Sequence, residues 1–206
     1  MLTQLLINTL IIGSGYALVA MAFRLMYWVS PFFNLTLGAS VALGAYLGYA
    51  LLPHLGIAAY PLVLLGVILF TWGLEAFIYK PMRNMGASSM VLLVVSLGVY
   101  TVFESIILLC FGPQYQTLGS AINFSQISLG FTNLPTVQAV IIALAFLTLI
   151  GISWMLNKTF LGKEIRAINQ SPALAHLIGI NTNRVIMIVS IIVGFMLTTI
   201  YTNLYR

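Results

Sequence analysis

Charged residues are scarce in this sequence. Of 206 residues, three are Asp or Glu and eight are Lys or Arg, which together make up 5% of the chain. A soluble domain usually carries about 25% charged residues, so this chain cannot cover a globule of its size with a solvated surface. The composition therefore excludes a cytosolic enzyme domain of the ordinary kind.

Cysteine and histidine are also scarce. The only cysteine, Cys110, has no partner for a disulfide within the chain, which leaves the redox compartment open. His54 and His176 are the only histidines and lie far apart in the sequence. With one cysteine they make no zinc-binding pattern, and we expect neither a metal nor another cofactor.

Hydrophobic residues, by contrast, make up 61% of the chain and fall in long runs. About 20 apolar residues are enough for a helix to cross a hydrocarbon core of about 30 Å. No linker divides residues 1–206, which we expect to form a single transmembrane domain. The sequence predicts an all-α polytopic membrane protein with six transmembrane helices in one bundle. The expected spans are residues 2–23, 32–52, 57–79, 89–111, 134–156 and 185–204.

The basic residues indicate how these spans are oriented. If six helices alternate in direction, seven of the eight Lys and Arg residues lie on one side. The connections at residues 53–56 and 112–133, on the other side, contain none. The positive-inside rule makes the basic side cytoplasmic and places both termini outside. The seven residues are Arg24, Lys80, Arg83, Lys158, Lys163, Arg166 and Arg184.

Small and polar residues recur on the second expected span. Thr36, Ser40, Gly44 and Gly48 follow one another at four-residue intervals and therefore share one helical face. Small residues let a neighbouring helix approach closely in lipid. A helix–helix contact is one interpretation of this face, and the lining of a substrate path is the other.

Two acidic residues need separate explanations. Glu104 lies well inside the fourth span, where a charge is expensive, so we expect it to face the bundle interior or a watery cavity, or to be protonated. It serves either the path or the structure, as a neutral hydrogen-bonded carboxyl. Glu75 lies near the cytoplasmic end of the third span, where a charge partner such as Lys80 or Arg83 is enough to explain it.

No set of residues suits catalysis. His54 and His176 are expected on opposite sides of the membrane, and the glycines of Gly13-Ser-Gly15 lack the following Lys of a phosphate-binding loop. We expect that the chain is not an enzyme and does not itself hydrolyse ATP. Tyr79, at the end of the third span, is typical of the aromatic residues that anchor helices at the membrane interface.

The longest charged segment, residues 157–184, is expected to hold two short helices. The first covers residues 163–169. Ser171 suits the N-cap of the second, Pro172 suits its first position, and Gly179 ends it. A helix of about two turns is marginal alone, so it must pack on its own membrane domain or in a partner's groove.

The residues after Ser171 resemble a coupling segment. Pro172-Ala-Leu-Ala-His-Leu-Ile-Gly179-Ile-Asn181, with Arg184-Val185, is similar to the Pro-Glu-Ala-Ala-x-x-x-Gly-Ile-Asn…Arg-Val stretch of one permease family. These permeases belong to bacterial ABC importers for branched-chain amino acids and for urea and short amides. In that family the stretch docks into the cytoplasmic ATPase. Other stretches resemble the family in the same order along the chain: residues 7–18, 34–46, 79–83, 96–113 and 162–167.

The sequence departs from the family pattern at several places. Ala-Leu-Ala at residues 173–175 stands where the family usually begins Glu-Ala-Ala, so a helix-starting acid is missing. Leu37 and Ala39 replace a frequent His and a frequent acidic residue, and Glu104 stands where Gln is common. Family members usually continue past the sixth span, so we expect this chain to lack their C-terminal membrane segments. Whether it transports without them is left open.

The resemblance implies a permease subunit of an ATP-driven importer in the bacterial plasma (inner) membrane. Its implied partners are cytoplasmic ABC ATPase subunits, a second permease that is identical or different, and an extracytoplasmic solute-binding protein on the side of residues 112–133. The resemblance does not choose among branched-chain amino acids, urea and amides. The alternatives are a non-transporting assembly or structural protein, whose charged loop meets lipid headgroups, and a small-solute channel.

Two sets of residues carry the implied function. One set is expected to couple the permease to the ATPase, and the other to line the translocation path. The coupling residues are Pro172, Ala173, Leu174, Ala175, Leu177 and Gly179. The path residues are Asn34, Thr36, Ser40, Gly44 and Glu104.

Overall fold

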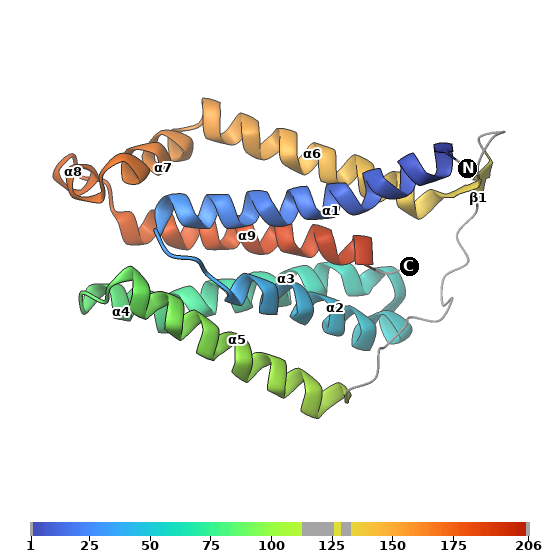
Figure 1. Cartoon of the computed structure of the whole chain (residues 1–206), viewed down its shortest axis with the longest axis horizontal. Coiled ribbons are helices and arrows are strands. Elements are labelled where there is room, and N and C mark those ends of the chain that lie inside the picture. The colour runs from blue at the N-terminus through green and yellow to red at the C-terminus, as the bar shows by residue number, and fades with distance from the viewer. Residues whose placement is uncertain (1, 113–125, 129–132, 205–206) are drawn as a thin grey trace.

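Long helices that run side by side dominate the computed structural model, which describes residues 2–112, 126–128 and 133–204 (Figure 1). A short 3₁₀ helix, η1 (Gly56–Ala58), precedes α3, and a π-helical turn, η2 (Glu75–Tyr79), joins α3 to α4. Strands β1 (Gln126–Ser128) and β2 (Asn133–Pro135) pair antiparallel. The α-helices are α1 (Leu2–Val29), α2 (Thr36–Leu55), α3 (Ala59–Leu74), α4 (Lys80–Asn84), α5 (Ser89–Phe111), α6 (Thr136–Lys158), α7 (Phe160–Gln170), α8 (Pro172–Leu177) and α9 (Thr182–Leu204).

The helices include enough membrane-spanning candidates to confirm the predicted fold class. Within the described ranges, five segments are long and apolar enough to cross a membrane, and a bent pair is a sixth candidate. The chain is thus an all-α membrane protein with five or six spans, to which β1 and β2 are a small addition. The five are Ile12–Val29, Thr36–Leu55, Ala59–Asn84, Ser89–Phe111 and Thr182–Thr199; the bent pair is Ala145–Lys158 with Phe160–Gln170.

The expected boundaries are wrong at the end of the bundle where the basic residues lie. α1 continues past residue 23 to Val29, because Arg24 stays within the helix with its guanidinium 4.6 Å from the centre of the Trp28 ring. The third span continues through η2 and α4 to Asn84. Counting apolar residues ends a span at its first charge, whereas a helix can carry an interfacial cation whose head reaches the water.

α9 forms the centre of the bundle. It lies between α1 and α3 in Figure 1, and half of its apolar window is buried, against 11% for α5. At Gly194, an added Cβ would lie 2.5 Å from the Thr71 hydroxyl oxygen and 3.1 Å from the Ile68 Cα atom. α9 and α3 therefore touch almost backbone to backbone, as small residues allow in lipid. The core around α9 includes Leu18, Leu25, Val63, Val67, Ile186, Val189, Val193 and Leu197.

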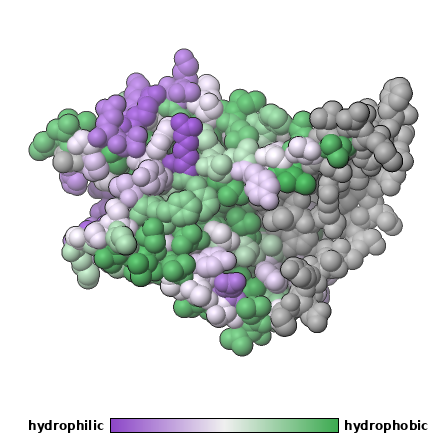
Figure 2. Space-filling model, viewed as in Figure 1, coloured by the Kyte–Doolittle hydropathy of each residue, from purple (hydrophilic) through white to green (hydrophobic). Residues whose placement is uncertain are grey.

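The two ends of the bundle differ in composition. α1 begins and α9 ends at one end, whereas α4, α7 and α8 lie at the opposite end (Figure 1). Hydrophilic residues gather over α7 in Figure 2, next to a hydrophobic tip over α8. The elements at this end carry the seven basic residues that sequence analysis assigned to one side. That this side is cytoplasmic stays a prediction.

Candidate functional site

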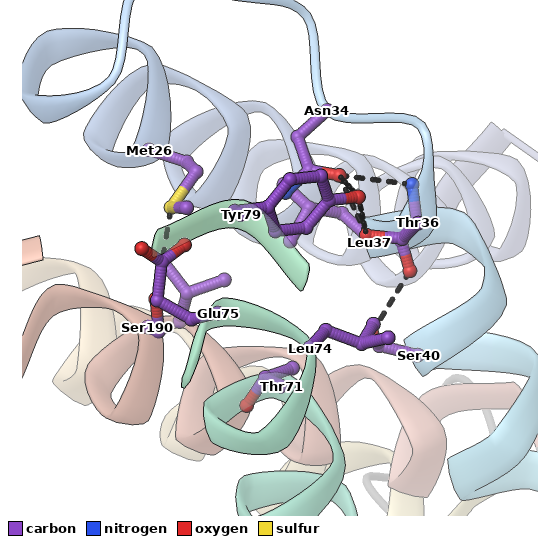
Figure 3. Close-up of a pocket in the computed structure, with 11 residues that line it drawn as sticks. Met26, Asn34, Thr36, Leu37, Ser40, Thr71, Leu74, Glu75, Tyr79 and Ser190 are labelled. Carbon is purple, nitrogen blue, oxygen red and sulfur yellow. Dashed lines mark hydrogen bonds between the residues drawn. The ribbon is translucent and has the colours of Figure 1, made fainter. Parts of the chain in front are cut away.

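Asn34 is the centre of a buried hydrogen-bond network at the start of α2. Its side-chain oxygen accepts from the Thr36 N–H at 3.1 Å, the Thr36 hydroxyl at 2.6 Å and the Tyr79 hydroxyl at 3.1 Å. Figure 3 shows these side chains pointing toward one another. The first amides of a helix lack partners within it, so Asn34 both satisfies the start of α2 and ties it to the third span.

α5 holds the same segment through Ser96, which is fully buried. The Leu35 N–H donates to the Ser96 hydroxyl oxygen at 3.3 Å. The Ser96 hydroxyl in turn lies 2.7 Å from the Leu93 carbonyl and 3.4 Å from the Phe33 carbonyl. The connection between α1 and α2 is therefore fixed from two directions, by α5 and by η2.

The π-helical turn η2 has a cause in the sequence. Pro81 follows it directly, and in a regular α-helix the proline ring clashes with the carbonyl four residues earlier. The wider turn carries the Lys80 N–H to the Glu75 carbonyl, five residues back. Turns of this kind occur frequently at functional sites.

Glu75, Tyr79 and Arg83 project from the same side of the third span, at intervals of four residues. Glu75 is 1% exposed and forms an ion pair with Arg83, whose side chain is 16% exposed. One carboxylate oxygen of Glu75, Oε2, has no hydrogen-bond partner within the described part of the chain. A buried ion pair costs much desolvation, and buried ionisable groups in membrane spans are usually functional.

A small cavity lies between α9 and the side chains of Glu75 and Tyr79 (Figure 3). The centre of a water molecule can move within about 10 Å³ of it, which is room for about one water. Glu75, Thr36, Ser40 and Tyr79 contribute polar atoms to the lining, and Ser190 faces them from α9. The cavity is therefore a space of about the size of a water molecule between α2, the third span and α9. The apolar side chains in its lining are those of Met26, Leu37, Leu74 and Val193.

Three of the five expected path residues meet at this cavity. Asn34, Thr36 and Ser40 line it, whereas Gly44 is buried farther along the same face of α2 and does not. The burial of Thr36, Ser40, Gly44 and Gly48 favours the interpretation of that face as a helix–helix contact within the chain. The role of these residues in a path stays a prediction.

Glu104 lies elsewhere. It is exposed on α5, so the first of the three expected alternatives, the interior of this chain's bundle, is wrong, and a watery cavity or protonation stays a prediction. The reason is that α5 packs on α2 and, through Leu92, on Phe32, Leu74 and Tyr79, and leaves most of its surface free. A role for Glu104 in the path stays a prediction, and within this chain it is separate from the cavity.

Two residues of the site were misjudged from the sequence. Glu75 was assigned an interfacial charge, and its partner is indeed Arg83, but the pair is buried. Tyr79 was assigned to the interface, yet it is 1% exposed and bonded to Asn34. The spacing of Glu75, Tyr79 and Arg83, just before and after Pro81, was the signal that could have placed them together.

The expected coupling segment forms α7 and α8. Ser171 caps α8, as predicted, by accepting from the Leu174 N–H at 3.4 Å. Pro172 occupies its first turn, and Gly179 follows it with φ +85°, a conformation that favours glycine.

α8 is held on one side and free on the other. Ala175 is buried, whereas Leu174 and Leu177 are 63% and 82% exposed. Pro172 and Gly179 are also exposed. Ala173 lies within α8, and its side chain is outside the described set.

Two further expectations concern sites elsewhere. Most of residues 112–133, the expected contact of a solute-binding protein, lies outside the described residues. Within the described ranges, no group of three or more His, Cys, Asp or Glu residues could hold a metal ion.

Comparison with known proteins identifies relatives along most of the chain. The profile of a family described as branched-chain amino acid transport system, permease component, matches residues 5–197. The chain is 24% identical to the high-affinity branched-chain amino acid transport system permease protein BraD of Pseudomonas aeruginosa, and 28% identical to LivH of Salmonella typhimurium. A probable branched-chain amino acid transport permease protein LivH of Methanocaldococcus jannaschii is 26% identical.

These matches cover the chain more fully than they cover the relatives. The matches to BraD and to the Salmonella LivH each cover 92% of this chain and 66% of the relative. The match to the Methanocaldococcus protein covers 88% of this chain and 59% of that protein. The chain therefore spans about two thirds of the length of the first two relatives. No solved structure matches the chain.

Proposed function

Because the chain belongs to the family of permease components of branched-chain amino acid transport systems, we propose that it is a membrane-spanning permease subunit of an ATP-driven importer. It moves branched-chain amino acids or similar small solutes inward across the plasma (inner) membrane of a bacterium. Its partners are two cytoplasmic ABC ATPase subunits, a second permease and an extracytoplasmic solute-binding protein. ATP is hydrolysed by the ATPase subunits.

The exposed apolar face of α8 is the observation that supports this function most directly. Leu174, Leu177 and Ile178 are 63%, 82% and 72% exposed at the tip of the bundle (Figure 2). Large apolar side chains gathered on a free surface indicate a contact with another protein. At the end of the bundle that carries the basic residues, this contact is the one expected for the ATPase.

The anchoring of α8 suits the transmission of a displacement. Ala175 is buried, and the Ile180 N–H donates to the Ala175 carbonyl at 3.0 Å, just before α9 begins. α9 starts at Thr182, only five residues after the end of α8 at Leu177. A short helix that is fixed to the central helix moves that helix when a partner pulls it, whereas a loose loop would not.

The cavity at Asn34 lies at the same end of the membrane domain as α8. Asn34, Thr36 and Ser40 would meet the solute late in its passage, after α9 shifts relative to α2 and the third span. Ser190 brings α9 directly to this cavity. We propose these residues as the cytoplasmic part of the path, with Gly44 farther along it. Glu104 would take part from α5, at the contact with the second permease.

The test is Leu177→Asp in the chain co-expressed with the ABC ATPase subunits of the same organism. We expect the variant to insert normally and to lose co-purification with the ATPase. The contact would bury the introduced carboxylate without a charged partner or water, which is costly. Met85→Asp is the matched control, since Met85 is 85% exposed at the same end of the bundle but lies outside α8. It should retain the ATPase.

The outcomes separate the proposal from its alternative. Normal co-purification of Leu177→Asp would remove the coupling role of α8. If the unmodified chain also fails to retain the ATPase, and no solute stimulates ATP hydrolysis, the chain is a non-transporting membrane protein.

A further inference from the structure

α6 presents an apolar stripe to the outside that ends in a lysine. Leu147, Ile150 and Trp154 are 71%, 66% and 64% exposed, and Lys158 is exposed one turn farther on. The intervals of three and four residues place all of them on one side of the helix. In a membrane this side contacts acyl chains, and a tryptophan followed by a lysine is typical of the level of the headgroups.

α7 adds two more cations to the end of this stripe. It bends away from α6 by 74° and buries Ile165 and Ile168 against the bundle. With 3.6 residues per turn, Lys163, Arg166 and Phe160 fall on the opposite arc, and all three are exposed.

An aromatic ring lies beside Lys163, at the start of α7. Phe160 follows Lys158 closely in the sequence, and the Lys163 ammonium lies 5.7 Å from the centre of its ring. Lys158 ends α6, and Lys163 and Arg166 follow within the first two turns of α7. We call Lys158, Lys163 and Arg166 with Phe160 the elbow.

The elbow carries uncompensated positive charge. Within the described part of the chain, the ion pair of Arg83 with Glu75 is the only one, so none of the three elbow cations is neutralised in that way. Glu164, the acidic residue nearest in sequence, is half-buried on the other flank of α7. Figure 2 shows the hydrophilic surface that results over α7.

We propose that the elbow is a binding site for an anionic phospholipid. The headgroup phosphate contacts Lys158, Lys163 and Arg166, and the acyl chains lie along Leu147, Ile150 and Trp154. Continuity between the apolar stripe and Lys158 selects a lipid as the occupant, because a water-soluble protein reaches the cations but not the stripe. The proposal is independent of the transport function and of which side of the membrane is cytoplasmic.

Trp154 provides a direct test once Trp28 and Trp72 are replaced by Phe. The chain is placed in nanodiscs of phosphatidylcholine with a small fraction of brominated phosphatidylglycerol, or with the same fraction of brominated phosphatidylcholine. We expect the quenching of Trp154 by brominated phosphatidylglycerol to correspond to a local fraction of this lipid about fivefold or more above its fraction in the nanodisc. The reason is that each basic residue near the surface attracts anionic lipid. The enrichment should fall as salt is raised.

Variants connect the enrichment to the elbow. Lys158→Gln/Lys163→Gln/Arg166→Gln should lose the enrichment and keep normal quenching by brominated phosphatidylcholine. Lys80→Gln/Arg184→Gln removes two cations from the same end of the bundle and should keep it. Lys158→Arg/Lys163→Arg/Arg166→Lys preserves the charge and should also keep it. If the Gln variant fails to fold, Lys158→Gln alone should still lower the enrichment.

Three results would overturn the proposal. One is equal quenching by the two brominated lipids in the chain with Trp154 alone. Another is enrichment that survives the Gln variant, or that falls as much in the Lys80→Gln/Arg184→Gln control. The third is a Trp154 that neither lipid quenches, because protein, such as a second copy of the chain, then covers the stripe.

Discussion

Two carboxylates within the membrane-spanning helices have opposite surroundings. Glu75 is buried in a π-helical turn against the central helix, paired with Arg83 and lining a small cavity. Glu104 is exposed on α5, the peripheral helix of the bundle. Because a charge in lipid is expensive wherever it lies, the difference separates two kinds of acid. Glu75 belongs to the fold of this chain, whereas Glu104 requires either a partner that covers α5 or protonation.

The largest effect is expected from breaking the buried ion pair. Arg83→Gln leaves Glu75 as an unpaired charge beside the cavity, and removing one partner of such a pair typically costs about 3–5 kcal/mol. We expect a loss of this size in the free energy of unfolding, measured by denaturant titration in micelles and followed by circular dichroism.

Two further variants show whether pairing is the cause. Glu75→Gln/Arg83→Gln should lose less than Arg83→Gln alone, because neither group is then charged. Lys80→Gln removes a charge from the same part of the helix but leaves the pair intact, and should change stability by less than about 0.5 kcal/mol. Equal losses in Arg83→Gln and Lys80→Gln would contradict the buried pair.

A smaller effect is expected from alanine substitutions at two glycines, Gly194 on the central helix α9 and Gly98 on the peripheral helix α5. Gly194→Ala places a Cβ against Thr71 and the backbone at Ile68, and overpacking of this kind usually costs about 1–3 kcal/mol. At Gly98 on α5 nothing lies within 4 Å of an added Cβ. There the change to alanine should be neutral or stabilise by up to about 1 kcal/mol. The same unfolding titration measures both, and the reverse order would contradict the close contact of α9 with α3.

The next effect concerns the hydrogen bonds that join Tyr79 to the start of α2. Tyr79→Phe removes the hydroxyl that donates to Asn34 and lies 3.1 Å from the Thr36 hydroxyl, while its ring still packs on Phe32. We expect a loss of about 1 kcal/mol in unfolding free energy. Tyr27→Phe is the control, because Tyr27 is exposed and should lose little. Equal losses at the two tyrosines would show that the network adds no stability.

The features that the sequence predicted correctly are local ones. Length and hydropathy alone define a membrane span, and a cap requires only the residues beside it. Five of the six expected spans and the beginning of α8 at Ser171 and Pro172 followed from such signals. The end of α8 at Gly179, which has a positive φ, also followed from a local signal.

The features that were missed depend on which helices face one another. Glu75 and Tyr79 are buried because η2 turns them toward α9 and α2, and neither neighbour is close in sequence. Glu104 occupies a similar apolar run, yet α5 packs mainly on α2 and leaves that side free. Sequence analysis assigned each acid from its depth in a span, and depth does not determine which side of the helix faces the bundle.

The smallest effect should come from a change at Glu104, which tests whether this acid is exposed on α5 while Glu75 is buried. Glu104→Gln in the isolated chain should change the unfolding free energy by less than about 0.5 kcal/mol, as is usual for an exposed position. Glu75→Gln should lose clearly more, because it leaves the Arg83 cation without its partner. If Glu104→Gln instead matches Glu75→Gln, Glu104 is inside the bundle and the arrangement of α5 is wrong. If Glu104→Gln is neutral alone but weakens co-purification with a second permease, α5 forms the contact between the two permeases.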